Sequence, residues 1–109
     1  MAVYTNNILI YTGTDFEQIF ILENDDGPFI LTGYTVIAKM KKHGGSTTAI
    51  SFSSSIADAN SGKVKVSIGA QDTTLISPGR YYYDLVLYKD GENTRVIEGD
   101  VIVKLSVTR

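Results

Sequence analysis

Cysteine and tryptophan are absent from this chain of 109 residues, and histidine occurs only once. Without cysteine the chain forms no disulfide, and with a single histidine a zinc or iron–sulfur site is not expected. No apolar run approaches the roughly 20 residues that span a bilayer, and the first residues lack the basic start and apolar stretch of a signal peptide. We therefore expect a protein without metal or cofactor that does not enter a membrane.

An excess of positive charge is also missing. The formal net charge is −2, and nucleic-acid binding requires a clear basic excess, so we expect no nucleic-acid partner. The length fits one domain, residues 1–109, with no room for a second. A chain of this size buries roughly 65% of its extended surface, which is enough for one core without disulfides or metals.

Residues that favour β-strands are abundant. The chain has seven tyrosines and many valines, isoleucines and threonines, and its ten glycines are spread along the sequence as turn formers. Four segments alternate between apolar and other residues, which is typical of strands with one buried face. The residues expected to face the core in these segments are Tyr34, Val36, Ala38 and Met40; Val64, Val66 and Ile68; Tyr81, Tyr83, Leu85 and Leu87; and Val101, Val103, Leu105 and Val107.

Further strands are expected at residues 8–12, 16–23 and 49–53, with Ile50 and Phe52 pointing inward in the last of these. The run from Ile19 to Leu22 does not alternate, which suits a strand covered on both faces. Turns are expected at 13–15, 24–28 and Asp90-Gly91, a bulge at Gly99, a loop at 43–46 and one helical turn at 71–76. The total is about seven or eight short strands, which predicts an all-β fold, an immunoglobulin-like antiparallel β-sandwich.

One local pattern supports the sandwich. Ser77-Pro78-Gly79-Arg80-Tyr81 leads from a polar stretch into a long strand that opens with a tyrosine. The pattern predicts a tyrosine corner, in which the buried ring of Tyr81 donates its hydroxyl to backbone a few residues upstream. The alternative is that Tyr81 is an ordinary core aromatic.

No catalytic residue and no metal ligand can be assigned. His43 lies between lysines and glycines in a solvated loop, where no orienting acid or nucleophile accompanies it. Glu23, Asp25 and Asp26 are acidic enough to suggest calcium, but the loop is too short for the six to eight oxygens that calcium requires. We read this acidic cluster as an ordinary solvated turn.

Two sets of residues are candidates for a protein interface. Tyr82, Val86 and Tyr88 share the face of their strand opposite to the core residues, and exposed apolar and aromatic patches often mark partner contacts. The alternative is that a neighbouring loop or the N-terminal segment covers them. The second set, Ile8, Ile10 and Tyr11, belongs to an N-terminal run without charge, which leaves a strand edge unguarded.

The order of several short motifs is similar to that in a known family. These motifs are Gly13-Thr14-Asp15-Phe16-Glu17-Gln18, Asp26-Gly27, Leu31-Thr32-Gly33-Tyr34-Thr35, Ser77 to Leu85, Glu98-Gly99 and Val107-Thr108-Arg109. In this order they resemble small domains of tailed-phage virion proteins, in particular the N-terminal domain of the phage baseplate upper protein family. The resemblance implies an immunoglobulin-like sandwich that docks other proteins onto the particle and forms oligomers.

These observations predict a non-catalytic structural protein of a bacteriophage virion, made in the host cytoplasm. It would be a tail or baseplate adaptor or a capsid decoration, and its partners would be other virion proteins and copies of itself. The main alternative is a carbohydrate-binding module that uses surface tyrosines. A hydrolase is a third possibility, for which no carboxylate pair or serine motif stands out.

Overall fold

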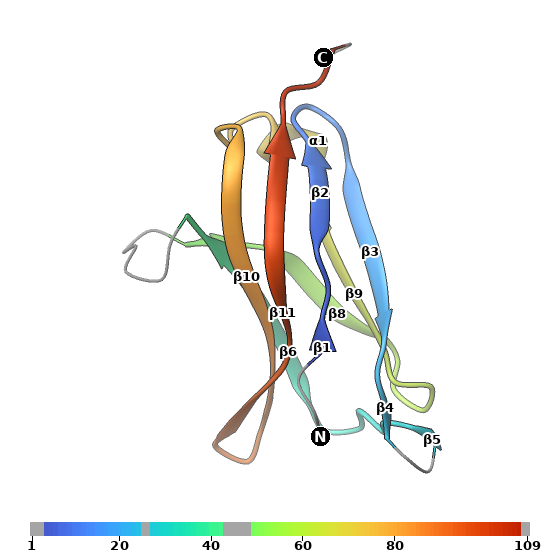
Figure 1. Cartoon of the computed structure of the whole chain (residues 1–109). Helices are drawn as coiled ribbons and strands as arrows, with labels where there is room; N and C mark the ends of the chain where they lie inside the picture. Colours follow the sequence, from blue (N-terminus) through green and yellow to red (C-terminus); the bar gives the residue numbers. More distant parts are fainter. Residues whose placement is uncertain (1–3, 25–26, 43–48, 108–109) are drawn as a thin grey trace.

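The computed structural model describes residues 4–24, 27–42 and 49–107. Two sheets pack face to face, and Figure 1 shows them as two layers of long strands. The larger sheet contains six strands: β1 (Tyr4–Thr5), β2 (Ile8–Tyr11), β6 (Thr35–Lys41), β7 (Ile50–Ser51), β10 (Gly79–Lys89) and β11 (Glu92–Lys104). The smaller sheet contains three: β3 (Phe16–Ile21), β8 (Ser53–Asp58) and β9 (Lys63–Ile68). A small hairpin, β4 (Glu23–Asn24) and β5 (Gly27–Pro28), and one helical turn, α1 (Ala70–Thr73), complete the described elements.

The strand order identifies an immunoglobulin-like β-sandwich. The larger sheet has the order β1-β11-β10-β6-β7, with β2 also paired to β11, and the smaller sheet has the order β3-β9-β8. The expected all-β sandwich is therefore confirmed. One detail differs, because β1 and β2 run parallel to β11, so the larger sheet is mixed rather than wholly antiparallel.

The core lies between the sheets and comes from the predicted alternation. Every second residue of β6, β9 and β10 is buried, as expected for strands with one solvated face. The buried residues of these three strands are Val36, Ala38, Met40, Val64, Val66, Ile68, Tyr81, Tyr83, Leu85 and Leu87. Ile50 is only partly buried, whereas Phe52 is buried and contacts the ring of Tyr83.

Expectations about two segments were wrong. Ile19 and Ile21 are exposed, because β3 alternates normally and only Phe20 between them reaches the core. Leu105 and Val107 are exposed, because β11 ends at Lys104 and the first residue of β10, Gly79, already pairs with Val103.

The bulge lies near Val96 instead of Gly99. Leu85 pairs with Ile97 and Val86 with Arg95, so Val96 is the extra residue, and both Val96 and Ile97 are buried. Gly99 pairs regularly with Tyr83, and a glycine is needed there because the chain passes close to it at Asn6. A Cβ atom at this position would collide with the backbone carbonyl of Asn6, which crosses over it.

The predicted turns are largely confirmed where the structure describes them. Tyr81 donates its hydroxyl to the carbonyl of Ser77 at 2.8 Å, which is the expected tyrosine corner. Asp90 and Gly91 both have positive φ, 54° and 85°, as a tight hairpin between twisted strands requires. The helical turn is shorter than expected and begins at Ala70. His43, Asp25 and Asp26 lie outside the described residues.

The sandwich is closed on one side and open on the other. On the closed side the chain crosses between the sheets, since β7 pairs with β6, Phe52 donates its N–H to Ala38, and Ser53 then pairs with Ser67 of β9. On the open side β2 and β3 are consecutive strands of different sheets and do not pair with each other. Within the described residues no helix is long and apolar enough to cross a membrane.

Candidate functional site

The outer face of the larger sheet carries the first set of interface candidates. Tyr82 and Tyr88 are 48% and 42% exposed, and Val86 between them is partly exposed. They alternate with the core residues of β10, as the sequence predicted. Val86 pairs with Ile37 of β6, which is also exposed, so a mixed apolar and aromatic surface runs along this face. No described strand of the chain lies over it.

The second set needs correction. Ile8 and Ile10 are buried, because β2 turns these two side chains into the core and pairs beside Val101 and Val103 of β11. They cannot contact a partner from that position. Tyr11 is exposed as expected, and Leu9, which the sequence analysis did not single out, shares the outward face with it.

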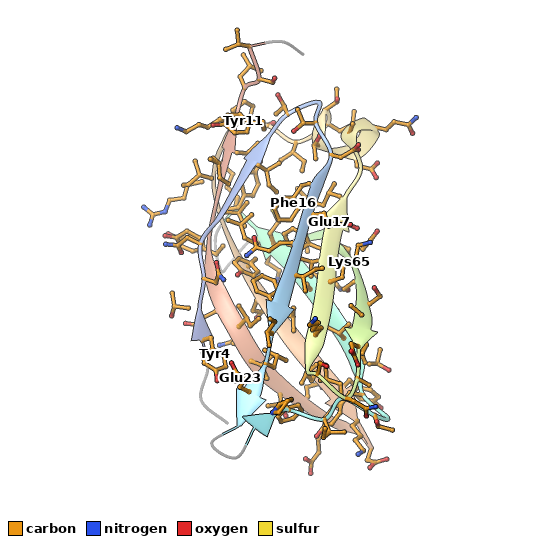
Figure 2. All side chains as sticks on the ribbon, turned by 90° about the vertical axis from the view of Figure 1, so that its right-hand side faces the viewer. Tyr4, Tyr11, Phe16, Glu17, Glu23 and Lys65 are labelled. Atoms are coloured by element: carbon orange, nitrogen blue, oxygen red, sulfur yellow. The ribbon has the colours of Figure 1, made fainter. Side chains whose placement is uncertain are left out.

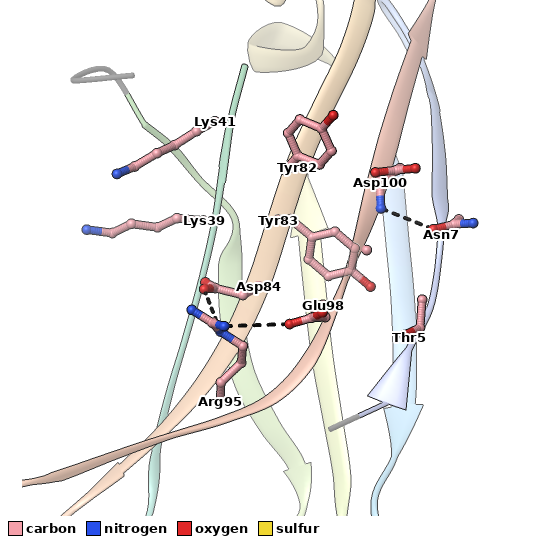
Figure 3. Close-up of a pocket in the computed structure, with 11 residues that line it drawn as sticks. Thr5, Asn7, Lys39, Lys41, Tyr82, Tyr83, Asp84, Arg95, Glu98 and Asp100 are labelled. Atoms are coloured by element: carbon pink, nitrogen blue, oxygen red, sulfur yellow. Dashed lines mark hydrogen bonds and ion pairs between the residues drawn. The ribbon is translucent and has the colours of Figure 1, made fainter. Parts of the chain in front are cut away.

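A shallow depression lies on the outer face between β6 and the β1–β2 edge (Figure 3). Its volume is about 830 Å³. The lining residues come from four strands and the link between β1 and β2: Thr5, Asn7, Lys39, Lys41, Tyr82, Tyr83, Asp84, Arg95, Glu98, Gly99 and Asp100. Gly99 shares the inward face of Tyr83, and a Cβ atom there would collide with the carbonyl oxygen of Asn6.

Ion pairs already occupy the acidic groups of the depression. Arg95 lies 3.2 Å from a carboxylate oxygen of Asp84 and 3.6 Å from one of Glu98, and Arg80 pairs with Asp100. The hydrogen bond from Arg80 to Asp100 raises the pKa of this guanidinium above its ordinary value. Each carboxylate therefore has an arginine partner. These exposed pairs stabilise the surface only weakly, but they leave no free carboxylate pair for acid–base chemistry.

Tyr83 is the one titratable group of the depression with a buried ring. Its hydroxyl donates to the carbonyl of Asn6 at 2.6 Å, and burial raises the pKa of the hydroxyl well above the ordinary 10.0. The hydroxyl holds the link between β1 and β2 against the core. Its role is therefore structural, and it offers no proton at neutral pH.

The described residues provide no metal site. No group of three or more histidine, cysteine, aspartate or glutamate side chains comes together in 4–24, 27–42 and 49–107. The acidic turn at Asp25 and Asp26 falls outside these ranges. Buried side-chain nitrogen and oxygen atoms in the described part of the chain all have hydrogen-bond partners.

The open side of the sandwich is a second candidate surface, and the sequence analysis found only part of it. Strand β3 lies at the edge of the smaller sheet and directs Ile19 and Ile21 outward, with exposures of 51% and 58%. Figure 2 views the molecule from this side, with the Glu17–Lys65 ion pair labelled on β3 and β9. Tyr4 of β1 donates its hydroxyl to the carbonyl of Glu23 at 3.0 Å and so joins the larger sheet to the β4–β5 hairpin.

Comparison with solved structures supports the fold. The chain matches no protein-family model and no curated protein in sequence. The crystal structure of Listeria monocytogenes InlP superposes with a TM-score of 0.53 at 14% identity, over 91% of this chain and 26% of that one. This chain therefore spans about a quarter of that protein. A VGSC beta subunit structure, from work on multimeric cell-adhesive interactions, gives a TM-score of 0.44 at 8% identity, over 94% of this chain and 92% of that one.

Proposed function

We propose that this chain is a non-catalytic structural module of a bacteriophage virion that acts through protein–protein contacts. The observation that carries the proposal is the open side of the sandwich. There, two sheet edges run side by side, and their strands β2 and β3 expose Leu9, Tyr11, Ile19 and Ile21. Unpaired strand edges with exposed apolar side chains are binding sites for other chains.

Two further points support this function. The described residues bring together no nucleophile, base and orienting acid, and the carboxylates of the depression are neutralised by arginines. The motif order resembles the N-terminal domain of the phage baseplate upper protein family, which implies a docking module. A tail or baseplate adaptor and a capsid decoration both fit, and both imply that the chain is made in the host cytoplasm and meets other virion proteins.

The test is incorporation into particles. A phage lysate that contains this chain is fractionated on a density gradient, and each fraction is quantified by mass spectrometry. We expect the chain to follow the capsid and tail proteins through the gradient, while a soluble host enzyme, as a control for contamination, stays at the top. A chain that remains with the soluble enzyme would contradict the virion role.

Carbohydrate binding is the second candidate, because Tyr82 is half exposed at the rim of the depression beside Asp84 and Asp100. Two features count against it. The guanidinium of Arg80 lies over one face of the Tyr82 ring, 5.8 Å from its centre, and so competes with a sugar for that face. Tyr82 and Tyr88 are six residues apart on one strand, about 20 Å, so they form no continuous platform. Glycan binding that Tyr82→Ala abolishes would favour this candidate.

A further inference from the structure

The four edges of the two sheets differ in how well they could accept another strand. In the larger sheet, β7 has only two residues, and the opposite edge is divided into β1 and β2 by Asn6 and Asn7. In the smaller sheet, the register of β8 shifts between Ile56 and Asp58. Strand β3 pairs with β9 over six consecutive residues without a shift. Of the described edges, β3 is therefore the longest regular one.

Strand β3 also lacks the features that protect the edges of monomeric proteins. Such edges are blunted by proline, bulges, inward charges or exposed lysines. Here the outward residues are Glu17, Ile19 and Ile21, and the only charge among them is neutralised by Lys65 of β9 at a distance of 2.8 Å (Figure 2). Within the described part of the chain no strand pairs with this edge, which thus combines free backbone groups with two exposed isoleucines and little charge.

We propose that β3 pairs in antiparallel fashion with β3 of a second copy of this chain, about a two-fold axis at Ile19. This inference rests on the proposed contact function and names one partner for it. The pairing joins two three-stranded sheets into a continuous six-stranded sheet. The free N–H and C=O groups of both edges then hydrogen-bond to each other, as in β-strand addition.

The register follows from the side chains. Residues that oppose each other across two antiparallel strands point to the same face of the joined sheet. Glu17 points to solvent and Phe20 to the core, so a register that places Glu17 opposite Phe20 is excluded. A register centred on Phe20 would set Glu17 against Glu23 of the other copy, a like-charge pair that is destabilising. Centring the axis on Ile19 sets the two Ile19 side chains against each other and Glu17 against Ile21. This register brings isoleucines together without opposing like charges.

A second copy suits this edge because a two-fold interface places the same residues of both copies in contact. The isoleucines of one copy then pack against those of the other, and the Glu17–Lys65 ion pair within each copy reduces the repulsion between the two Glu17 carboxylates. One pair of six-residue strands buries less than the roughly 1,200 Å² of a standard interface. We therefore expect a reversible dimer that forms in the micromolar range of concentration.

Single cysteines test the register, because the chain has no cysteine of its own. Directly opposed residues of an antiparallel pair lie within disulfide distance. Under mild oxidation Ile19→Cys should form a covalent dimer quickly. Ile30→Cys, which places a thiol at a 53% exposed position outside β3 and outside both candidate surfaces, should not. No dimer from Ile19→Cys, equal cross-linking of Ile30→Cys, or faster cross-linking of Ile21→Cys would overturn the proposal.

Sedimentation equilibrium tests the pairing without a covalent bond. Wild type should approach twice the monomer mass as its concentration rises. Ile19→Glu should weaken the dimer at least 10-fold, because two carboxylates then meet at the axis. The monomer should still fold, because Lys65 lies opposite position 19 on β9 and stabilises the new carboxylate. The matched control, Ile30→Glu, changes a 53% exposed isoleucine outside β3 and should dimerise like wild type. Circular dichroism checks that both variants are folded.

The outcomes separate this inference from the proposed function. A strictly monomeric wild type, or a dimer that Ile19→Glu leaves intact, overturns the β3 pairing. Either result leaves particle incorporation to be decided by the gradient experiment. A chain found in particles but monomeric in solution would support the proposed function and overturn the pairing between copies.

Discussion

Tyr81 and Tyr83 lie two residues apart on β10 and point into the same core, yet their hydroxyls bond to different parts of the chain. Tyr81 donates to Ser77, four residues upstream, and so fixes the approach to its own strand. Tyr83 donates to Asn6, 77 residues away, and so fixes the N-terminal edge. Removing each hydroxyl therefore has a different expected consequence.

Tyr81→Phe should lower the free energy of unfolding by about 1 kcal/mol, because the Ser77 carbonyl loses its donor while the ring stays packed. The measurement is denaturant unfolding at neutral pH. Tyr82→Phe, on the exposed face of the same strand, is the control and should stay close to wild type. A Tyr81→Phe variant as stable as the control would mean that the corner contributes nothing.

The buried phenol of Tyr83 should make the folded protein lose stability at high pH. The unfolded chain ionises this phenol near pH 10, whereas burial raises the pKa in the folded protein well above that value. The contribution is therefore complete below about pH 10 and is lost as the pH rises further, by up to about 1.4 kcal/mol per pH unit. Tyr83→Phe should show a shallower decline between about pH 10 and 12. Parallel curves for the two proteins would contradict this explanation.

At the scale of elements, Gly99 connects β11 to the N-terminal edge. Gly99→Ala should cost about 2 kcal/mol or more, because the new methyl group collides with the Asn6 carbonyl and pushes β1 away. Gly69→Ala is a matched control, since Gly69 has φ −72° and nothing within 4 Å of a Cβ atom. It should change stability by less than about 0.5 kcal/mol. Equal effects of the two substitutions in thermal unfolding would disprove this reading of Gly99.

Sequence periodicity predicted the central strands well and the edge strands poorly. The inward residues of β6, β9 and β10 followed from alternation alone, because those strands pair on both sides and have one buried face. The apolar run of β3 concealed its alternation, because Ile19 and Ile21 are as hydrophobic as Phe20 between them. The parallel pairing of β2 with β11 depends on contacts more than 90 residues apart, which local patterns do not encode.

The candidate surface was only partly predictable for the same reason. Tyr82, Val86 and Tyr88 were found because they alternate with clear core residues. Ile8 and Ile10 were assigned to the surface because their run has no charge, although that absence reflects burial on β2. The available signal for an exposed face on β3 was the pair of opposite charges Glu17 and Lys65, which are diagonal neighbours on β3 and β9. This signal becomes visible only once the register of β3 and β9 is known.

At the scale of the whole molecule, the fold should need no metal. The described residues contain no cluster of metal-ligating side chains, and the chain has no cysteine. Thermal unfolding should give the same midpoint with chelator, with added calcium and with neither. A midpoint that falls by several degrees in chelator would point to the acidic turn around Asp25 and Asp26 as a binding site.

Central to the proposed contact function is the pairing of the β3 edge, on the open side of the sandwich, with a second copy of this chain. Hydrogen–deuterium exchange as a function of protein concentration tests it most directly. Residues 16–21 of β3 should exchange more slowly as the concentration rises through the micromolar range, because their outward N–H groups become hydrogen-bonded to a second chain. The central strand β10 should not change. Exchange along β3 that is independent of concentration would contradict the claim.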